Sequence, residues 1–209
     1  MGDMSFHRPA MFAGHEFSAF EGASDPAAVS ALAHESASLL LAQVKDAPTA
    51  VVDRAVELTD EHGLDLAAEL WSQTGAHSLP GSLWRLYLVR AVIREQDAHM
   101  SHLYAVGNAV LHTADHVVAG APTPAGPAEI RELADQILRG AFAGDYGHAL
   151  ERAAAFCRVT AAGCIEQAHE NDATNADLAA ALTTQGARLS TIGSELDVCA
   201  RLWRSDNLV

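Results

Sequence analysis

Basic residues are scarce in this sequence. Lys45 is the only lysine, and 13 basic residues stand against 27 acidic ones, so the formal net charge is -14. An electrostatic field of that sign repels both the phosphate backbone of nucleic acids and the surface of anionic membranes. We therefore expect no nucleic-acid partner and no binding to a membrane.

Long apolar runs are missing as well. No stretch approaches the roughly 20 consecutive apolar residues that a membrane-spanning helix needs. Asp3, His7 and Arg8 lie where a secretory signal would carry its apolar segment. The cysteines are few, and Cys157 and Cys164 are too far apart on a predicted helix to form a disulfide. These features predict a cytoplasmic protein in a reducing compartment.

Short catalytic motifs are also absent. The chain has no glycine-rich phosphate loop, no Gly-x-Ser-x-Gly, no Cys-x-x-Cys and no His-Glu-x-x-His. The Glu-x-x-His spacing that di-iron bundles need in pairs occurs only at Glu166 and His169. We therefore expect no cofactor, and the sequence favours a non-enzymatic role.

Helical periodicity is what the sequence has in quantity. Apolar residues recur three and four positions apart, and no segment alternates strictly enough to be a half-buried strand. Helix-starting residues such as Asp25 with Pro26, and Asp145, precede several of these segments. We predict an all-α helical bundle of about seven helices. They cover 26–44, 48–63, a short segment 64–72, 83–94, 99–118, 127–140 and two long segments that begin after Asp145 and after Thr174.

The last two predicted helices share a pattern of tiny residues. Each has an apolar period of about 3.5 residues, which is typical of helices that pack at a shallow angle. A row of tiny residues runs beside each apolar seam and would let two backbones approach closely. Because the connection between the helices is short, we expect a long antiparallel hairpin. The rows are Gly147, Ala154, Ala161 and Ala168 in the first helix, and Ala179, Gly186, Gly193 and Ala200 in the second.

One segment, 119–127, marks the clearest boundary in the chain. It reads Ala-Gly-Ala-Pro-Thr-Pro-Ala-Gly-Pro, and such residues do not continue a helix. It separates a first helical half, 25–118, from a second helical half, 128–209. We expect the two halves to form one compact domain.

The segment 1–24 has no helical pattern, yet it holds four of the six phenylalanines. Rings of that size are costly to leave in water. We expect this N-terminal arm to lie either across its own domain or over a partner subunit. Trp203, near the end of the last helix, is a further candidate. The predicted interface residues are Phe6, Phe12, Phe17, Phe20 and Trp203, and they favour a protein that forms a homodimer or docks a protein partner.

Two polar clusters give the alternative hypothesis of a bundle with an internal ligand site. His112 and His116 are four residues apart on the predicted helix 99–118, with Asp115 beside them, so they could hold a metal ion. The same residues could equally lie on a solvated helix face.

The second cluster is made of arginines. Arg90 and Arg94 share one face of an otherwise apolar predicted helix and could bind a small anionic ligand together with Tyr87. They could instead form internal ion pairs with acidic residues of the bundle.

Overall fold

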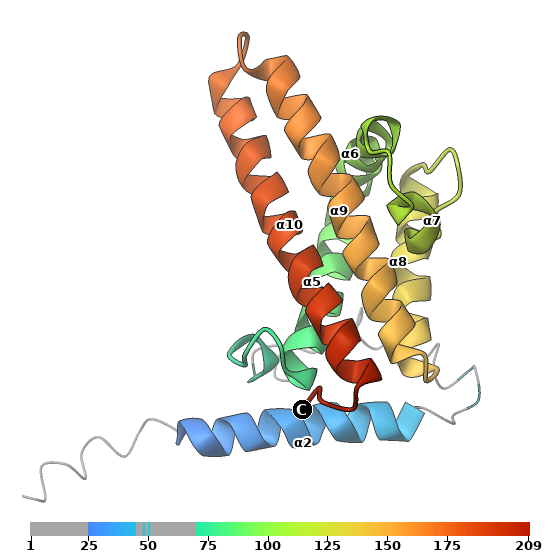
Figure 1. Cartoon of the computed structure of the whole chain (residues 1–209), viewed down its shortest axis with the longest axis vertical. Helices are drawn as coiled ribbons and strands as arrows, with labels where there is room; N and C mark the ends of the chain where they lie inside the picture. The colour runs from blue at the N-terminus through green and yellow to red at the C-terminus, as the bar shows by residue number, and fades with distance from the viewer. Residues whose placement is uncertain (1–24, 45–47, 49, 51–69) are drawn as a thin grey trace, which may run out of the picture.

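The computed structural model describes residues 25–44, 48, 50 and 70–209 (Figure 1). The predicted arm, 1–24, and the predicted helices 48–63 and 64–72 lie outside the described residues, apart from residues 48, 50 and 70–72. Within the described ranges the chain forms helices and no strand, so the all-α prediction is confirmed. The helices are α2 (Pro26–Val44), α5 (Leu79–Glu95), α6 (Asp97–Val110), α7 (Asp115–Ala119), α8 (Pro127–Phe142), α9 (Tyr146–Asn171) and α10 (Ala176–Arg204).

The long hairpin of α9 and α10 is confirmed, and the two helices lie side by side in Figure 1. The eight tiny residues named above are all buried. A Cβ atom added to Gly193 would lie 3.2 Å from the carbonyl oxygen of Ala154, and one added to Gly186 would lie 3.3 Å from that of Ala161. The amide of Asn175 begins the second helix by accepting a hydrogen bond from the N–H of Leu178 at 3.1 Å. Tiny residues therefore set the short distance between the two backbones.

A second close approach, between α6 and α9, is not indicated by any local sequence pattern. Gly107 and Gly163 face each other where the helices cross. A Cβ atom on Gly107 would lie 1.8 Å from the carbonyl oxygen of Val159, and one on Gly163 would lie 1.9 Å from that of Leu103. No side chain fits between backbones at that distance, so the crossing requires glycine on both helices.

The prediction of one helix over 99–118 is wrong. The structure has α6 and α7 in its place, because the chain leaves the helical conformation at Leu111, whose φ is -87° and ψ is 112°. Thr113 and Asp115 stabilise the new start. The Thr113 hydroxyl donates a hydrogen bond to the Asp115 carboxylate at 2.7 Å and accepts one from the Asp115 N–H at 3.3 Å. Side chains of this kind compete with helical backbone hydrogen bonds.

The helix α5 is almost surrounded by others, and α2 crosses the end of the bundle where the chain ends (Figure 1). Burial of Leu83, Leu86 and Ile93 fixes α5 in the core. The N–H of Leu79 donates to the carbonyl of Val209 at 3.1 Å, which holds the C-terminus against the start of α5. None of the helices within the described ranges combines the length and apolar character that a membrane crossing requires.

Candidate functional site

Of the predicted interface residues, Trp203 lies within the described part of the chain, whereas Phe6, Phe12, Phe17 and Phe20 lie outside it. The Trp203 ring packs edge-on against Tyr146, with the ring centroids 4.9 Å apart. It also lines a largely apolar cavity of about 300 Å³ between α2 and the rest of the bundle. Trp203 is half-buried, so part of its surface is already covered by its own chain.

Tyr146 is the polar centre of the same end of the bundle. Its hydroxyl lies 2.6 Å from the Ser82 hydroxyl, which also donates to the carbonyl of Leu79 at 2.8 Å. Burial raises the pKa of Tyr146 above its ordinary value, and the hydrogen bond with Ser82 opposes this shift only in part. This pair joins α5 to α9 and satisfies polar atoms that would otherwise be buried without partners.

The three predicted metal ligands are not arranged as the helical spacing implied. His112 lies in the connection between α6 and α7, so His112 and His116 do not share a helix face. The Asp115 carboxylate is held by Arg158 and Thr113. His116 borders a surface hollow of about 710 Å³ between α7 and α8, together with Glu129 and Glu132. The part of the chain that the structure describes has no group of three or more His, Cys, Asp or Glu side chains placed to hold a metal ion.

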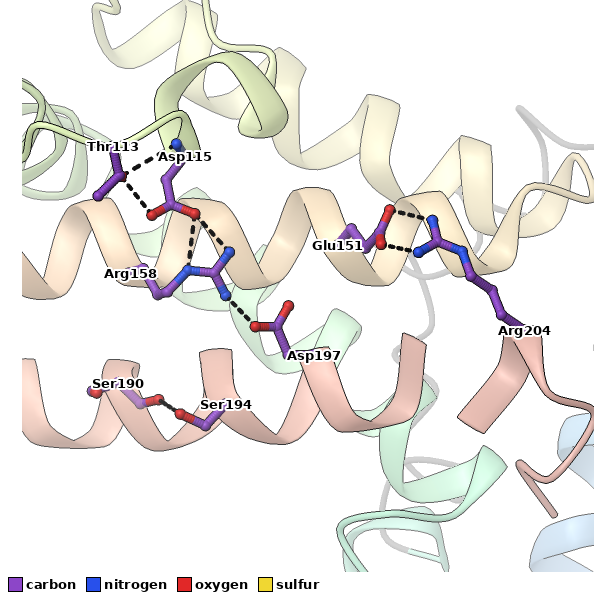
Figure 2. A network of polar contacts seen from close by, with 8 residues as sticks. All are labelled: Thr113, Asp115, Glu151, Arg158, Ser190, Ser194, Asp197 and Arg204. Carbon is purple, nitrogen blue, oxygen red and sulfur yellow. Dashed lines mark hydrogen bonds and ion pairs between the residues drawn. The ribbon is translucent and has the colours of Figure 1, made fainter. Parts of the chain in front are cut away.

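Arg158 is the centre of a network that sequence reasoning missed (Figure 2). Its guanidinium donates to Asp115 at 2.6 and 2.9 Å and to Asp197 at 2.6 Å. Partial burial pushes the pKa of Asp115 upward, but the hydrogen bonds from Arg158 and Thr113 and the charge of Arg158 outweigh it and hold the pKa below its ordinary value. The network ties α7, α9 and α10 together. Its partners are about 40 residues away in sequence, so no local pattern points to them.

A second ion pair between the hairpin helices lies near the end of the chain. Figure 2 shows the guanidinium of Arg204 facing the carboxylate of Glu151 with two parallel hydrogen bonds. This two-point geometry is the strong form of an arginine–carboxylate contact. It fixes the end of α10 against the start of α9.

The predicted anion-binding arginines both reach one carboxylate. Arg90 Nε lies 2.7 Å from Asp135 Oδ1, and Arg94 Nη1 lies 3.2 Å from Asp135 Oδ2. Arg90 is only 5% exposed, so its pairing with Asp135 is an internal one. Tyr87 stacks on Trp71 at 5.9 Å and contacts Phe142, and burial raises the pKa of its hydroxyl. Of the two arrangements that the sequence left open, the structure has the internal ion pair.

The three cysteines are free and fully buried. Burial raises the pKa of the Cys157 thiol to about 12, and the pKa values of the Cys164 and Cys199 thiols to about 11. A thiol with such a pKa is protonated at neutral pH and reacts slowly, because the thiolate is the nucleophile. These side chains serve packing of the hairpin.

An open groove remains between α5 and the first half of α10. It has a volume of about 660 Å³. Its walls are mostly apolar or uncharged, and several of the side chains are half-buried. The lining residues are Leu88 and Val92 from α5, Gln96 from the connection between α5 and α6, and Ala180, Ala181, Thr184, Gln185, Arg188, Leu189 and Ile192 from α10.

The groove and the charged networks differ in what they leave accessible. Asp115, Asp135 and Arg158 already bind side chains of their own chain, whereas the groove exposes apolar surface to solvent. The groove is therefore our candidate functional site, and its chemistry suits a protein surface better than a small charged ligand. Comparison with protein-family models, with curated proteins and with solved structures finds no match.

Proposed function

We propose that this protein is a non-enzymatic helical bundle that acts by associating with a protein chain, and that this chain is a second copy of itself. The observation that carries the proposal is the exposed side of the first half of α10. No charged residue occurs between 178 and 187, although the chain has a net charge of -14. A helix that faces only water usually carries charged residues on its outer side.

The shape of the molecule supports the same proposal. Figure 1 shows no other described helix on the outer side of the first half of α10. Ala180, Ala181, Thr184 and Ala187 are all exposed there, and the apolar groove with α5 adjoins them. Small side chains let another helix approach closely, and an apolar groove gains free energy when it is covered.

The polar groups of the described residues give further support. The candidate ligands Asp115, Arg90 and Arg94 take part in ion pairs within the chain, and the thiols are buried and protonated. The Phe-rich arm, 1–24, remains a second predicted source of contacts with a partner.

Sedimentation velocity of the untagged full-length chain over a wide range of concentrations tests the proposal. We expect a reversible dimer whose fraction rises with concentration. A variant lacking residues 2–22 should dimerise less if the arm contributes, and should match the full chain if the interface lies only on α10. A full-length chain that remains monomeric at every concentration would contradict self-association.

A further inference from the structure

The exposed side of α10 carries two opposite charges at a spacing that suits self-pairing. Asp177 and Arg188 are eleven residues apart. Eleven residues make three full helical turns plus about 20° of rotation, so both positions lie on the same side of the helix. Ala181 and Thr184 lie between them on the same line. Asp177 and Arg188 are exposed, and neither forms an ion pair with another residue of the described ranges. An acid and a base therefore bracket an uncharged stretch on one face of one helix.

We propose that two copies of the chain pair α10 against α10, antiparallel, about a two-fold axis that passes between Leu182 and Thr183. This inference rests on the proposed self-association and specifies its surface. In that register Asp177 of each copy faces Arg188 of the other, and Ala181 faces Thr184. A two-fold interface must be complementary to itself, and this arrangement of charges satisfies that condition.

The groove beside α10 fits the same occupant. The partner helix would lie over Ala181 and Thr184 and cover the half-buried Leu88 and Val92 on the wall formed by α5. The two hairpins would then place four long helices side by side, with α9 of each copy on the outside.

Electrostatics favours this face over the rest of the surface. With a net charge of -14, two copies repel each other wherever acidic residues meet. The stretch 178–187 avoids that repulsion because it has no charged residue, and its flanking charges attract. Opposite charges around an interface mainly select the register and orientation of the partners.

Two charge reversals test the pairing. Asp177→Arg places arginine at both positions of one chain, and Arg188→Asp places aspartate at both. Each variant alone should dimerise roughly tenfold or more weakly than the wild type, because both inter-chain pairs become repulsive. An equal mixture of the two variants should form a heterodimer with both pairs restored, and the double variant Asp177→Arg/Arg188→Asp should recover homodimerisation.

The mixture of the two variants distinguishes a lost inter-chain ion pair from other causes of weaker dimerisation. A helix end weakened by substitution cannot be rescued by a second, different chain, and net charge alone would make Asp177→Arg associate better, not worse. Arg201→Asp is the matched control, because Arg201 is exposed on α10 away from this face and its reversal should leave the dimer unchanged. Single variants that dimerise like the wild type would overturn the α10 pairing while leaving self-association intact. A monomeric wild type would overturn both.

Discussion

Replacing Gly163 with alanine should destabilise the protein, although alanine is normally the better helix former. The added Cβ would lie 1.9 Å from the carbonyl oxygen of Leu103 and 2.9 Å from the backbone nitrogen of Gly107. Ordinary van der Waals contact begins at 3.4 Å, so α6 and α9 would have to separate by about 1.5 Å. The obstructing atoms belong to a helix backbone and cannot rotate away.

The size of the effect follows from two opposing contributions. Overpacking costs about 1 to 3 kcal/mol, and a rigid backbone obstacle places this site at or above the upper end of that range. The higher helix propensity of alanine offsets about 1 kcal/mol of this cost. We expect a net loss of about 2 to 3 kcal/mol in the free energy of unfolding, which for a chain of this size lowers Tm by roughly 5 to 10 °C.

Thermal and urea unfolding followed by circular dichroism measures this loss, and Gly140→Ala is the matched control. Gly140 also lies in a helix, but a Cβ atom added there would have no heavy atom of another segment within 4 Å, so alanine should be neutral or stabilising. Gly107→Ala should cost about as much as Gly163→Ala. The double variant Gly107→Ala/Gly163→Ala should lose less free energy of unfolding than the sum of the two single losses, because one separation of the helices relieves both contacts. Equal stability of Gly163→Ala and Gly140→Ala would refute the close crossing.

Two substitutions and one chemical probe test other contacts. Gly193→Leu should destabilise by at least about 1 to 3 kcal/mol in urea unfolding, because its side chain would collide with Ala154 across the hairpin, and a raised Tm would mean that this row faces solvent. Asp115→Asn should cost about 1 to 2 kcal/mol at neutral pH through its lost charged hydrogen bonds with Arg158. The folded pKa of Asp115 lies below the ordinary value of 3.8. The wild type should therefore exceed the variant in free energy of unfolding by the full amount above that pH, and this difference should be lost as the pH falls through the folded pKa. Unfolding at a series of pH values measures the difference. A constant difference at all pH values would contradict the assignment. The thiols of Cys157, Cys164 and Cys199 should react with a chromogenic disulfide reagent only after unfolding, and rapid reaction of the native chain would show that they are accessible.

Local and periodic features of the fold could be predicted from sequence. The hairpin of α9 and α10 follows from tiny residues at regular spacing, and the start of α2 follows from Asp25 and Pro26, where the Asp25 carboxylate accepts the N–H of Ala27 at 3.0 Å. These patterns are read within one helix, and each has a direct physical meaning. The break between α6 and α7 was missed, because apolar periodicity through Val118 outweighed the turn-forming pair Thr113 and Asp115.

Contacts between distant segments could not be predicted. Gly107 and Gly163 are isolated glycines on separate helices, and nothing in either segment indicates that they meet. Arg158 is one of many arginines in an acidic chain, and its partners Asp115 and Asp197 become neighbours only through the packing of α7 and α10 on α9. The groove between α5 and α10 likewise depends on the angle between two helices that are far apart in sequence.

Native mass spectrometry of the untagged full-length protein distinguishes a self-associating bundle from a ligand-binding one, because one spectrum reports both the number of subunits and any bound mass. We expect a homodimer of the 22.0 kDa chain with no additional mass. A monomer that carries a metal ion or a small ligand would contradict it, and would return attention to the arginines and histidines of the bundle.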